Sequence, residues 1–273
     1  MDAGSAWRAL SGTAAEFYQQ HLVPGMFAPW APLLADLVDV QPGEVCLDVA
    51  CGTGVVARVL AERVGARGRV YGIDINAEML AVAQLVPTTA DIDIQWTTAD
   101  ALMLPMGDDT IDVAVSQHGL QQMSSRPAAL EEMLRVLRPG GRLGIVVWST
   151  PPGSPGMEAL ITALAQLVGL EAAVNRLRPF ALGDADELRG LITQAGFIDV
   201  HLQTRSVPTG FTSVEQLVAA QLNATPLSTL GEIDDATHAD IVEHVRAALA
   251  PWIVGGVLRV PMEAHLVLAR KLA

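Results

Sequence analysis

The stretch that most constrains this chain runs from Val45 to Gly54, Val-Cys-Leu-Asp-Val-Ala-Cys-Gly-Thr-Gly. An apolar segment containing an acid leads into a glycine loop, and a helical pattern follows over Val55–Val64. Glycine suits such a loop because it has no Cβ, which permits unusual dihedral angles and close approach of a ligand. A strand, a tight turn and a helix N-terminus together form a typical nucleotide-binding arrangement. The ligand stays open at this point, because Gly52–Ala57 also fits the G-x-G-x-x-A pattern of dinucleotide-binding proteins.

The length and composition set the broad class. A chain of 273 residues suits one elaborated domain or a core with a cap. Hydrophobic residues make up 51% of it, but they form no apolar run long enough for a transmembrane helix, so we predict no membrane span. The first residues lack the basic and then apolar pattern of a signal peptide, which predicts a cytoplasmic protein.

The charge and the cysteine count exclude several partners. Seventeen basic residues against thirty acidic ones give a net charge of −13, which argues against a nucleic acid as partner. Two cysteines, Cys46 and Cys51, are too few for a disulfide framework or a zinc site, and we predict no metal. We therefore expect a small-molecule substrate and a monomer or homodimer.

Strands and helices alternate through the middle of the chain, which predicts a mostly parallel sheet with helices on both faces. Helices are expected after the glycine loop, after the N-cap Asn76 and from Pro127. A final pair of strands around a helical insertion predicts an antiparallel hairpin at the sheet edge. The predicted strands cover residues 44–49, 69–73, 92–96, 111–116, 142–148, 198–206 and 258–270, and the later helices cover 157–168, 184–195 and 213–250.

The predicted organisation is a single compact domain with a cap. Residues 1–40 form an N-terminal helical lid and residues 41–150 the cofactor-binding core. Residues 151–273 complete the core and carry substrate-cap insertions at about 151–182 and 207–256, where Leu, Val, Ala and Met predict a largely apolar pocket. Within the cap, Arg176 and Arg178 either meet an anionic group or cap the preceding helix, and the cap is the favoured interpretation.

Two acids follow the glycine loop at the ends of successive strands. Asp74 ends the second strand, where a carboxylate accepts hydrogen bonds from ribose hydroxyls, although a helix N-cap or a loop acid also fits. Asp100 follows the third strand and is placed to accept from an adenine amine, with Ala101 supplying a backbone N–H; an ordinary loop acid is the alternative. The apolar slot for a flat base is predicted from Gly72, Ile75 and Met79.

The combined motifs resemble class I S-adenosylmethionine-dependent methyltransferases, in the small-molecule branch that includes quinone-biosynthesis C-methyltransferases. The similarity rests on residues 47–54, 72–80, 99–105 and 135–143, in that order along the chain. It implies a Rossmann-like, seven-stranded, mostly parallel α/β sheet with an antiparallel last strand and helical cap segments. It also implies S-adenosyl-L-methionine as cofactor and S-adenosyl-L-homocysteine as product.

The resemblance assigns roles to the acids. Asp48 and the Gly52–Gly54 backbone surround the methionine part of the cofactor, Asp74 holds the ribose, and Asp100 with Ala101 holds the adenine. An acid at position 48 suits an ammonium and a sulfonium and disfavours the pyrophosphate of a dinucleotide. The predicted cofactor-binding residues are Asp48, Ala50, Cys51, Gly52, Gly54, Asp74, Ile75, Met79, Asp100, Ala101 and Gln117.

The acceptor side is less clear from the sequence. Open α/β sheets bind ligands beyond the carboxyl ends of their strands. His118, after the fourth strand, is the candidate general base, because an unperturbed imidazole titrates near neutrality; packing beneath the cofactor is the alternative. Tyr18 and His21 are further catalytic candidates from the lid, with core packing as their alternative, and Trp148 either walls the acceptor pocket or is simply buried.

These observations predict a methyltransferase that moves a methyl group by in-line displacement to an O, N or C nucleophile of a small, largely apolar metabolite. The alternative is a protein of the same fold that binds the cofactor without methylating. Such a protein would catalyse another reaction, such as a cyclisation, or none.

Overall fold

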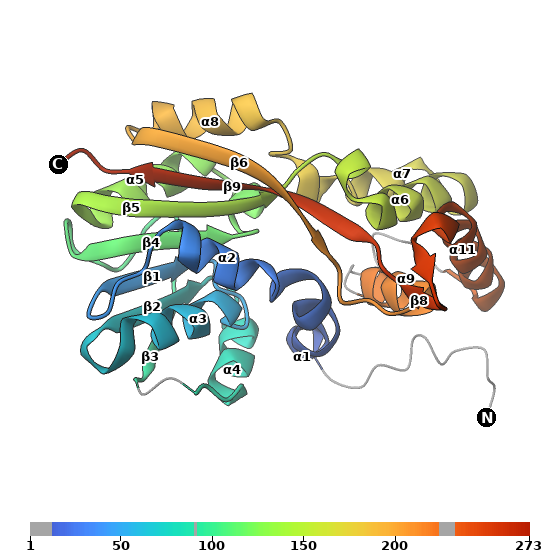
Figure 1. Cartoon of the computed structure of the whole chain (residues 1–273), viewed down its shortest axis with the longest axis horizontal. Helices are drawn as coiled ribbons and strands as arrows, with labels where there is room; N and C mark the ends of the chain where they lie inside the picture. Colours follow the sequence, from blue (N-terminus) through green and yellow to red (C-terminus); the bar gives the residue numbers. More distant parts are fainter. Residues whose placement is uncertain (1–12, 90–91, 224–232) are drawn as a thin grey trace. The chain divides into compact units, whose positions relative to one another are not determined.

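The computed structural model describes residues 13–89, 92–223 and 233–273 (Figure 1). The chain divides into two compact units. The core unit comprises residues 27–149, 182–205 and 264–273, and the helical unit comprises the remaining segments up to 26, 150–181 and 206–263. The helical unit therefore contains part of the predicted lid, whereas residues 27–40 belong to the core unit.

The core unit is built on the predicted sheet, with the strand order β3-β2-β1-β4-β5-β9-β6. The β1, β2, β3, β4 and β5 strands pair in parallel, and β9 lies antiparallel to β5. The late antiparallel strands at one edge and the mostly parallel remainder confirm the predicted fold class. The strands are β1 Val45–Val49, β2 Arg69–Asp74, β3 Ile94–Thr98, β4 Ile111–Gln117, β5 Leu137–Trp148, β6 Ile198–Pro208 and β9 Pro261–Arg270.

Helices cover both faces of this sheet (Figure 1). Leu47 and Val49 of β1 pack with α5 and α8 in one core cluster, whereas Asp48, between them, points to α3 on the other face. Because both faces are covered, the central strands β1 and β4 are buried on both sides rather than alternating, whereas β3 and β6 at the sheet edges are more exposed. The helices of this unit are α2 Trp30–Leu37, α3 Val55–Val64, α4 Ala77–Leu85, α5 Arg126–Val136 and α8 Ala185–Gln194, with the short turns η3 Gly65–Arg67 and η4 Leu120–Gln122.

Two predicted strand starts in the parallel part of the sheet were wrong. The third strand begins two residues later than expected, at Ile94, because its register with β2 pairs Val70 with Ile94 and Asp74 with Thr98. The fifth strand begins at Leu137, before the Pro-Gly-Gly sequence that was expected to precede it. That sequence is accommodated by a register shift against β4 and by the positive φ of Gly140, 76°, whose N–H donates to the Lys271 carbonyl.

The helical unit contains the predicted late helices. In it α6 packs against α7 and α11, and α9 packs against α11. The predicted helical stretch 213–250 is represented by α9 and α11, and residues 224–232 between them lie outside the described part. The elements are α1 Ala14–Phe17, the π-helix η2 Tyr18–Phe27, η5 Pro151–Gly153, α6 Pro155–Leu167, α7 Leu170–Asn175, η6 Arg178–Phe180, α9 Val214–Asn223, α11 Asp235–Ala248, η7 Ala250–Trp252, β7 Ile253–Val254 and β8 Val257–Leu258.

The predicted strand 258–270 is divided in the structure. Gly255 and Gly256, with φ of 59° and 79°, turn the chain between β7 and β8, and β9 starts only at Pro261. Across the described ranges, no helix combines the length and the apolar character that crossing a membrane requires.

Candidate functional site

The glycine loop joins β1 to α3 through three residues of positive φ. Ala50, Gly52 and Gly54 have φ of 57°, 55° and 80°, and Gly54 is the N-cap residue of α3. Ala50 adopts this conformation despite its Cβ, which costs an L-residue about 1–2 kcal/mol. The Cys51 N–H donates to the Ile73 carbonyl at 2.9 Å, which fixes the loop against β2. The loop backbone is therefore held in the left-handed turns that bring α3's first N–H groups to the sheet edge.

Asp48 lies under this loop with only 1% of its surface exposed. Its Oδ2 accepts a hydrogen bond from the Ala57 N–H, in the first turn of α3, at 2.9 Å. Burial raises the pKa of Asp48 to about 7, and the nearby Asp74 adds to the rise, while the Ala57 N–H and Arg58 oppose it. A carboxyl in this setting titrates near neutrality and gains from a cationic ligand.

Asp74 ties the loop to the end of β2. Its Oδ2 accepts from the Gly52 N–H at 2.7 Å, and its Oδ1 accepts from the Asn76 N–H at 2.8 Å. A carboxylate oxygen accepts two hydrogen bonds, so each oxygen keeps one lone pair for a ligand hydroxyl. Asp74 therefore stabilises the glycine loop through its hydrogen bond with Gly52 and keeps acceptor capacity for a ligand at the end of β2.

The third acid lies at the end of β3, next to Asp74. Thr98 pairs with Asp74, and the Ala99 N–H donates to the Asp74 carbonyl at 3.1 Å. Asp100 is exposed, and its Oδ1 accepts from the Leu102 N–H at 2.9 Å. The ends of β1, β2 and β3 therefore bring Asp48, Gly52, Asp74 and Asp100 to one sheet edge, as the sequence predicted, with Ala101 half-buried beside them.

The predicted base slot is only partly open. Ile75 is 70% exposed and Met79 is half-buried at the start of α4, so both are accessible next to Asp74. Gly72 is not: a Cβ at this position would lie 2.4 Å from the Trp96 indole. The indole extends from β3 across Gly72 to Gly54, and it occupies the part of the predicted base slot that lies over Gly72.

This contact predicts opposite effects for the same substitution at two glycines. Gly72→Ala is expected to lower the free energy of unfolding by about 1–3 kcal/mol, because the half-buried indole must shift. Gly190→Ala, inside α8 with no heavy atom near the added Cβ, is expected to raise it by up to about 1 kcal/mol through helix propensity. Urea denaturation measures both values, and equal effects at the two positions would contradict the role given to Trp96.

Gln117 and His118 lie at the end of β4. Gln117 Nε2 donates to the Phe27 carbonyl at 2.9 Å, which anchors the chain ahead of α2. His118 has a φ of 55°, and its ring stacks on Trp148 with a centroid distance of 3.6 Å. Phe27 and Trp30 contact the same imidazole edge-on at 5.5 and 6.3 Å.

The surroundings of His118 bear on its predicted role as general base. The residue is 8% exposed, and neither ring nitrogen has a hydrogen-bond partner among the described residues. Burial lowers the pKa of His118 well below its usual value. The imidazole is therefore neutral at physiological pH and a weaker base than a solvated histidine.

The other two catalytic candidates, Tyr18 and His21, lie on η2 in the helical unit. The His21 ring stacks on Phe17 with centroids 4.5 Å apart, as expected for aromatic packing on a helix. The core unit that holds the acids does not include them, and their catalytic role stays a prediction.

Sequence reasoning missed Arg58 and Trp96. Arg58 Nη2 donates to the Thr53 carbonyl at 2.7 Å, so its side chain folds back over the loop, and burial lowers its pKa. The spacing in the sequence could have indicated Arg58, since it follows the N-cap Gly54 by one helical turn. No comparable signal marks Trp96, whose contact depends on the β2–β3 register.

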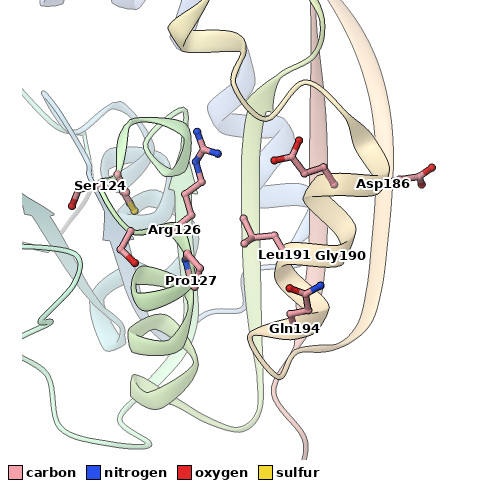
Figure 2. A pocket seen from close by; sticks show the side chains of 10 residues that line it. Ser124, Arg126, Pro127, Asp186, Gly190, Leu191 and Gln194 are labelled. Carbon is pink, nitrogen blue, oxygen red and sulfur yellow. The ribbon is translucent and has the colours of Figure 1, made fainter.

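Two surface cavities of the core unit lie away from this edge. One, of about 660 Å³, separates the start of α5 from α8, with Arg126 on one side and Asp186 on the other (Figure 2). The other, of about 520 Å³, lies at the amino ends of β1 and β2. Neither includes a predicted cofactor residue. Within the described ranges, no group of three His, Cys, Asp or Glu side chains is placed to hold a metal.

The donor set at the sheet edge fits S-adenosylmethionine. Buried and half-buried carboxylates suit its ammonium, its sulfonium and its ribose hydroxyls, whereas a pyrophosphate would face two acids. The strand order, the glycine loop and the acids after β2 and β3 define a Rossmann-like, S-adenosylmethionine-dependent methyltransferase.

More narrowly, the chain belongs to the ubiE/COQ5 methyltransferase family, whose model matches residues 20–166. The 2-phytyl-1,4-naphtoquinone methyltransferase of Thermosynechococcus vestitus is 35% identical over 63% of this chain and 80% of its own length. The ubiquinone/menaquinone biosynthesis C-methyltransferase UbiE of Teredinibacter turnerae is 34% identical over 63% and 74%. The solved structure of the [4+2]-cyclase SpnF shares the fold, with a TM-score of 0.55 and 21% identity over 90% of this chain and 82% of the cyclase.

Proposed function

We propose that this methyltransferase acts on a ring carbon of a reduced, largely apolar quinone. The proposal rests on what the relatives of this chain are named for. They are quinone methyltransferases, and the chain aligns with most of their length. A hydroquinone fits this role because its hydroxyl oxygens make the adjacent ring carbon nucleophilic. The new carbon–carbon bond forms as the methyl–sulfur bond breaks and releases S-adenosyl-L-homocysteine, and the methylated ring carbon then loses its proton to water.

The core unit supplies cofactor binding in this proposal. Asp48 and the backbone of the loop from Ala50 to Gly54 surround the methionine part, and Asp74 accepts from the ribose hydroxyls. Asp100 and Ala101 meet the adenine edge, and Ile75 and Met79 contact its face; Cys51 and Gln117 lie at the ends of β1 and β4 around the same edge. When bound, the cofactor supplies a methyl group on a positively charged sulfur, which an aligned nucleophile attacks in line.

His118 and Trp148 form the aromatic wall at the end of β4 and β5. We assign His118 to this wall as a neutral ring, because its burial, its stacking and its lowered pKa all disfavour the protonated form that a general base must become. An apolar wall suits a flat, apolar acceptor.

The substrate proposal is tested by incubating the protein with methyl-labelled S-adenosylmethionine and 1,4-naphthohydroquinone. We expect label in a ring-methylated product, identified by mass spectrometry. The oxidised 1,4-naphthoquinone is the matched control, and it is expected to remain unlabelled because its ring carbon is not nucleophilic. A protein that binds the cofactor but labels no hydroquinone would contradict the proposal and favour the non-methylating alternative.

The role of His118 predicts how two substitutions differ. His118→Phe keeps an aromatic ring and is expected to retain turnover within about threefold, whereas His118→Asn, which tolerates the positive φ, is expected to lose most of it. Turnover of each variant with the hydroquinone is measured from pH 6 to 9. A loss of about 100-fold or more in His118→Phe, with a wild-type rate that follows one titration, would instead identify a general base.

A further inference from the structure

Arg176 is a buried arginine of the helical unit. It is the C-cap residue of α7 and is 7% exposed, while Arg178, two residues later, is exposed. The sequence favoured a side chain that caps the preceding helix, but the guanidinium contacts a different helix. Its Nη2 donates to the Gln221 carbonyl near the C-terminal end of α9. Arg176 therefore ends α7 as its C-cap residue, while its guanidinium donates to a neighbouring helix.

The charge of Arg176 has no counter-charge in the part of the chain that the structure describes. None of the ion pairs there includes it, although Arg135 and Arg142 each pair with a glutamate. The Nε–H is buried and has no acceptor among the same residues. Burial lowers the pKa of Arg176 to about 10, so the group still carries its charge at neutral pH.

Capping α9 does not account for this arrangement. The helix C-terminus offers a partial negative charge, and the single carbonyl uses one of the five N–H donors of a guanidinium. A buried cation without a counter-charge destabilises the fold, and a neutral side chain in the same place would avoid that loss. The unused Nε–H and the uncompensated charge therefore both indicate an anionic ligand.

We infer that Arg176 anchors a site for a small organic carboxylate within the helical unit. The planar guanidinium fork matches the two oxygens of a carboxylate. One guanidinium balances one negative charge, whereas a phosphate monoester brings about −1.5 to −2 at neutral pH. Ala172 and Ala173, about one turn before Arg176 on α7, are buried, and the side chain of its partner residue Gln221 donates to Met26 Sδ. These surroundings favour a carboxylate on an apolar skeleton.

The inference is tested on the full chain with 1-naphthoate, and the neutral 1-naphthamide serves as matched probe. Calorimetry is expected to show binding of the carboxylate at least tenfold tighter than of the amide. Arg176→Met is expected to abolish this preference, while Arg178→Met, the exposed control, keeps it. Inorganic phosphate is expected not to compete.

Arg176→Lys is a second variant, which keeps the test valid if Arg176→Met does not fold. It keeps the charge and loses the fork, so a weaker but persistent carboxylate preference is expected. Equal binding of carboxylate and amide by the wild-type protein, or an unchanged preference in both Arg176 variants, would overturn the inference. S-adenosylmethionine affinity, measured in parallel, is expected to be unchanged in Arg176→Met, which separates this site from the proposed methyl transfer.

Discussion

Lowering the pH from 8 to 5.5 is expected to weaken S-adenosylmethionine binding by about 30-fold, because Asp48 becomes protonated over this range. Its pKa of about 7 reflects burial, with Asp74 raising it further and Arg58 opposing the rise. A cationic ligand binds the ionised form, so affinity falls about tenfold for each pH unit below 7. The lower limit stays above the sequence pI of about 4.7, near which solubility falls.

Asp48→Asn is the control for this titration, since it removes the ionisable group and keeps an acceptor for the Ala57 N–H. The variant is expected to bind more weakly than the wild type at pH 8 and equally at pH 5.5. Calorimetry in buffers of different ionisation enthalpy should show about half a proton released per wild-type binding event at pH 7. A wild-type affinity independent of pH would show that Asp48 does not face the cofactor's charge.

The same group affects the stability of the ligand-free protein with the opposite sign. The folded-state pKa of Asp48 is raised above its unfolded value of 3.8, so the folded chain binds more protons between these two values. Stability therefore increases as the pH falls through 7, by about 2 kcal/mol from pH 8 to 5.5 for this group. Asp48→Asn is expected to remove that part of the pH dependence in urea denaturation.

Asp74→Ala is expected to weaken cofactor binding by about 1.5–3 kcal/mol, or roughly 10- to 150-fold. The structure adds a second loss to the predicted one, because the carboxylate also accepts from the Gly52 and Asn76 N–H groups. Asp74→Asn, whose amide oxygen replaces only one of the two acceptors, should give an intermediate affinity in calorimetry.

Asp36→Ala provides the matched control for Asp74, since Asp36 is an exposed acid of α2 that pairs only with Arg63 among the described ion pairs. It is expected to leave the affinity unchanged. If Asp74→Ala bound the cofactor as tightly as this control, the ribose assignment would be wrong.

Local sequence was sufficient to predict the glycine loop and the acids at the carboxyl edge of the sheet. The strand, the glycine loop and the helix that follow one another from Val45 to Val64 are neighbours in the chain, so their pattern carries their geometry. Asp74 and Asp100 were predictable because parallel strands bring their carboxyl ends to one edge. The start of β5 was not predictable, because its Pro-Gly-Gly segment is held by hydrogen bonds with Lys271, at the far end of the chain.

The sequence by itself determined the α/β class and predicted the acids and glycines at the carboxyl edge of the sheet, since both follow from short-range pattern and spacing. The tertiary structure decided the burial, the pKa and the contacts of those residues. Burial moves the pKa of Asp48 toward neutrality and that of His118 away from it, and the β2–β3 register places Trp96 over Gly72. It also decided that Arg176 reaches α9 instead of its own helix. Desolvation and contacts between distant segments depend on the whole packed chain, which no local pattern encodes.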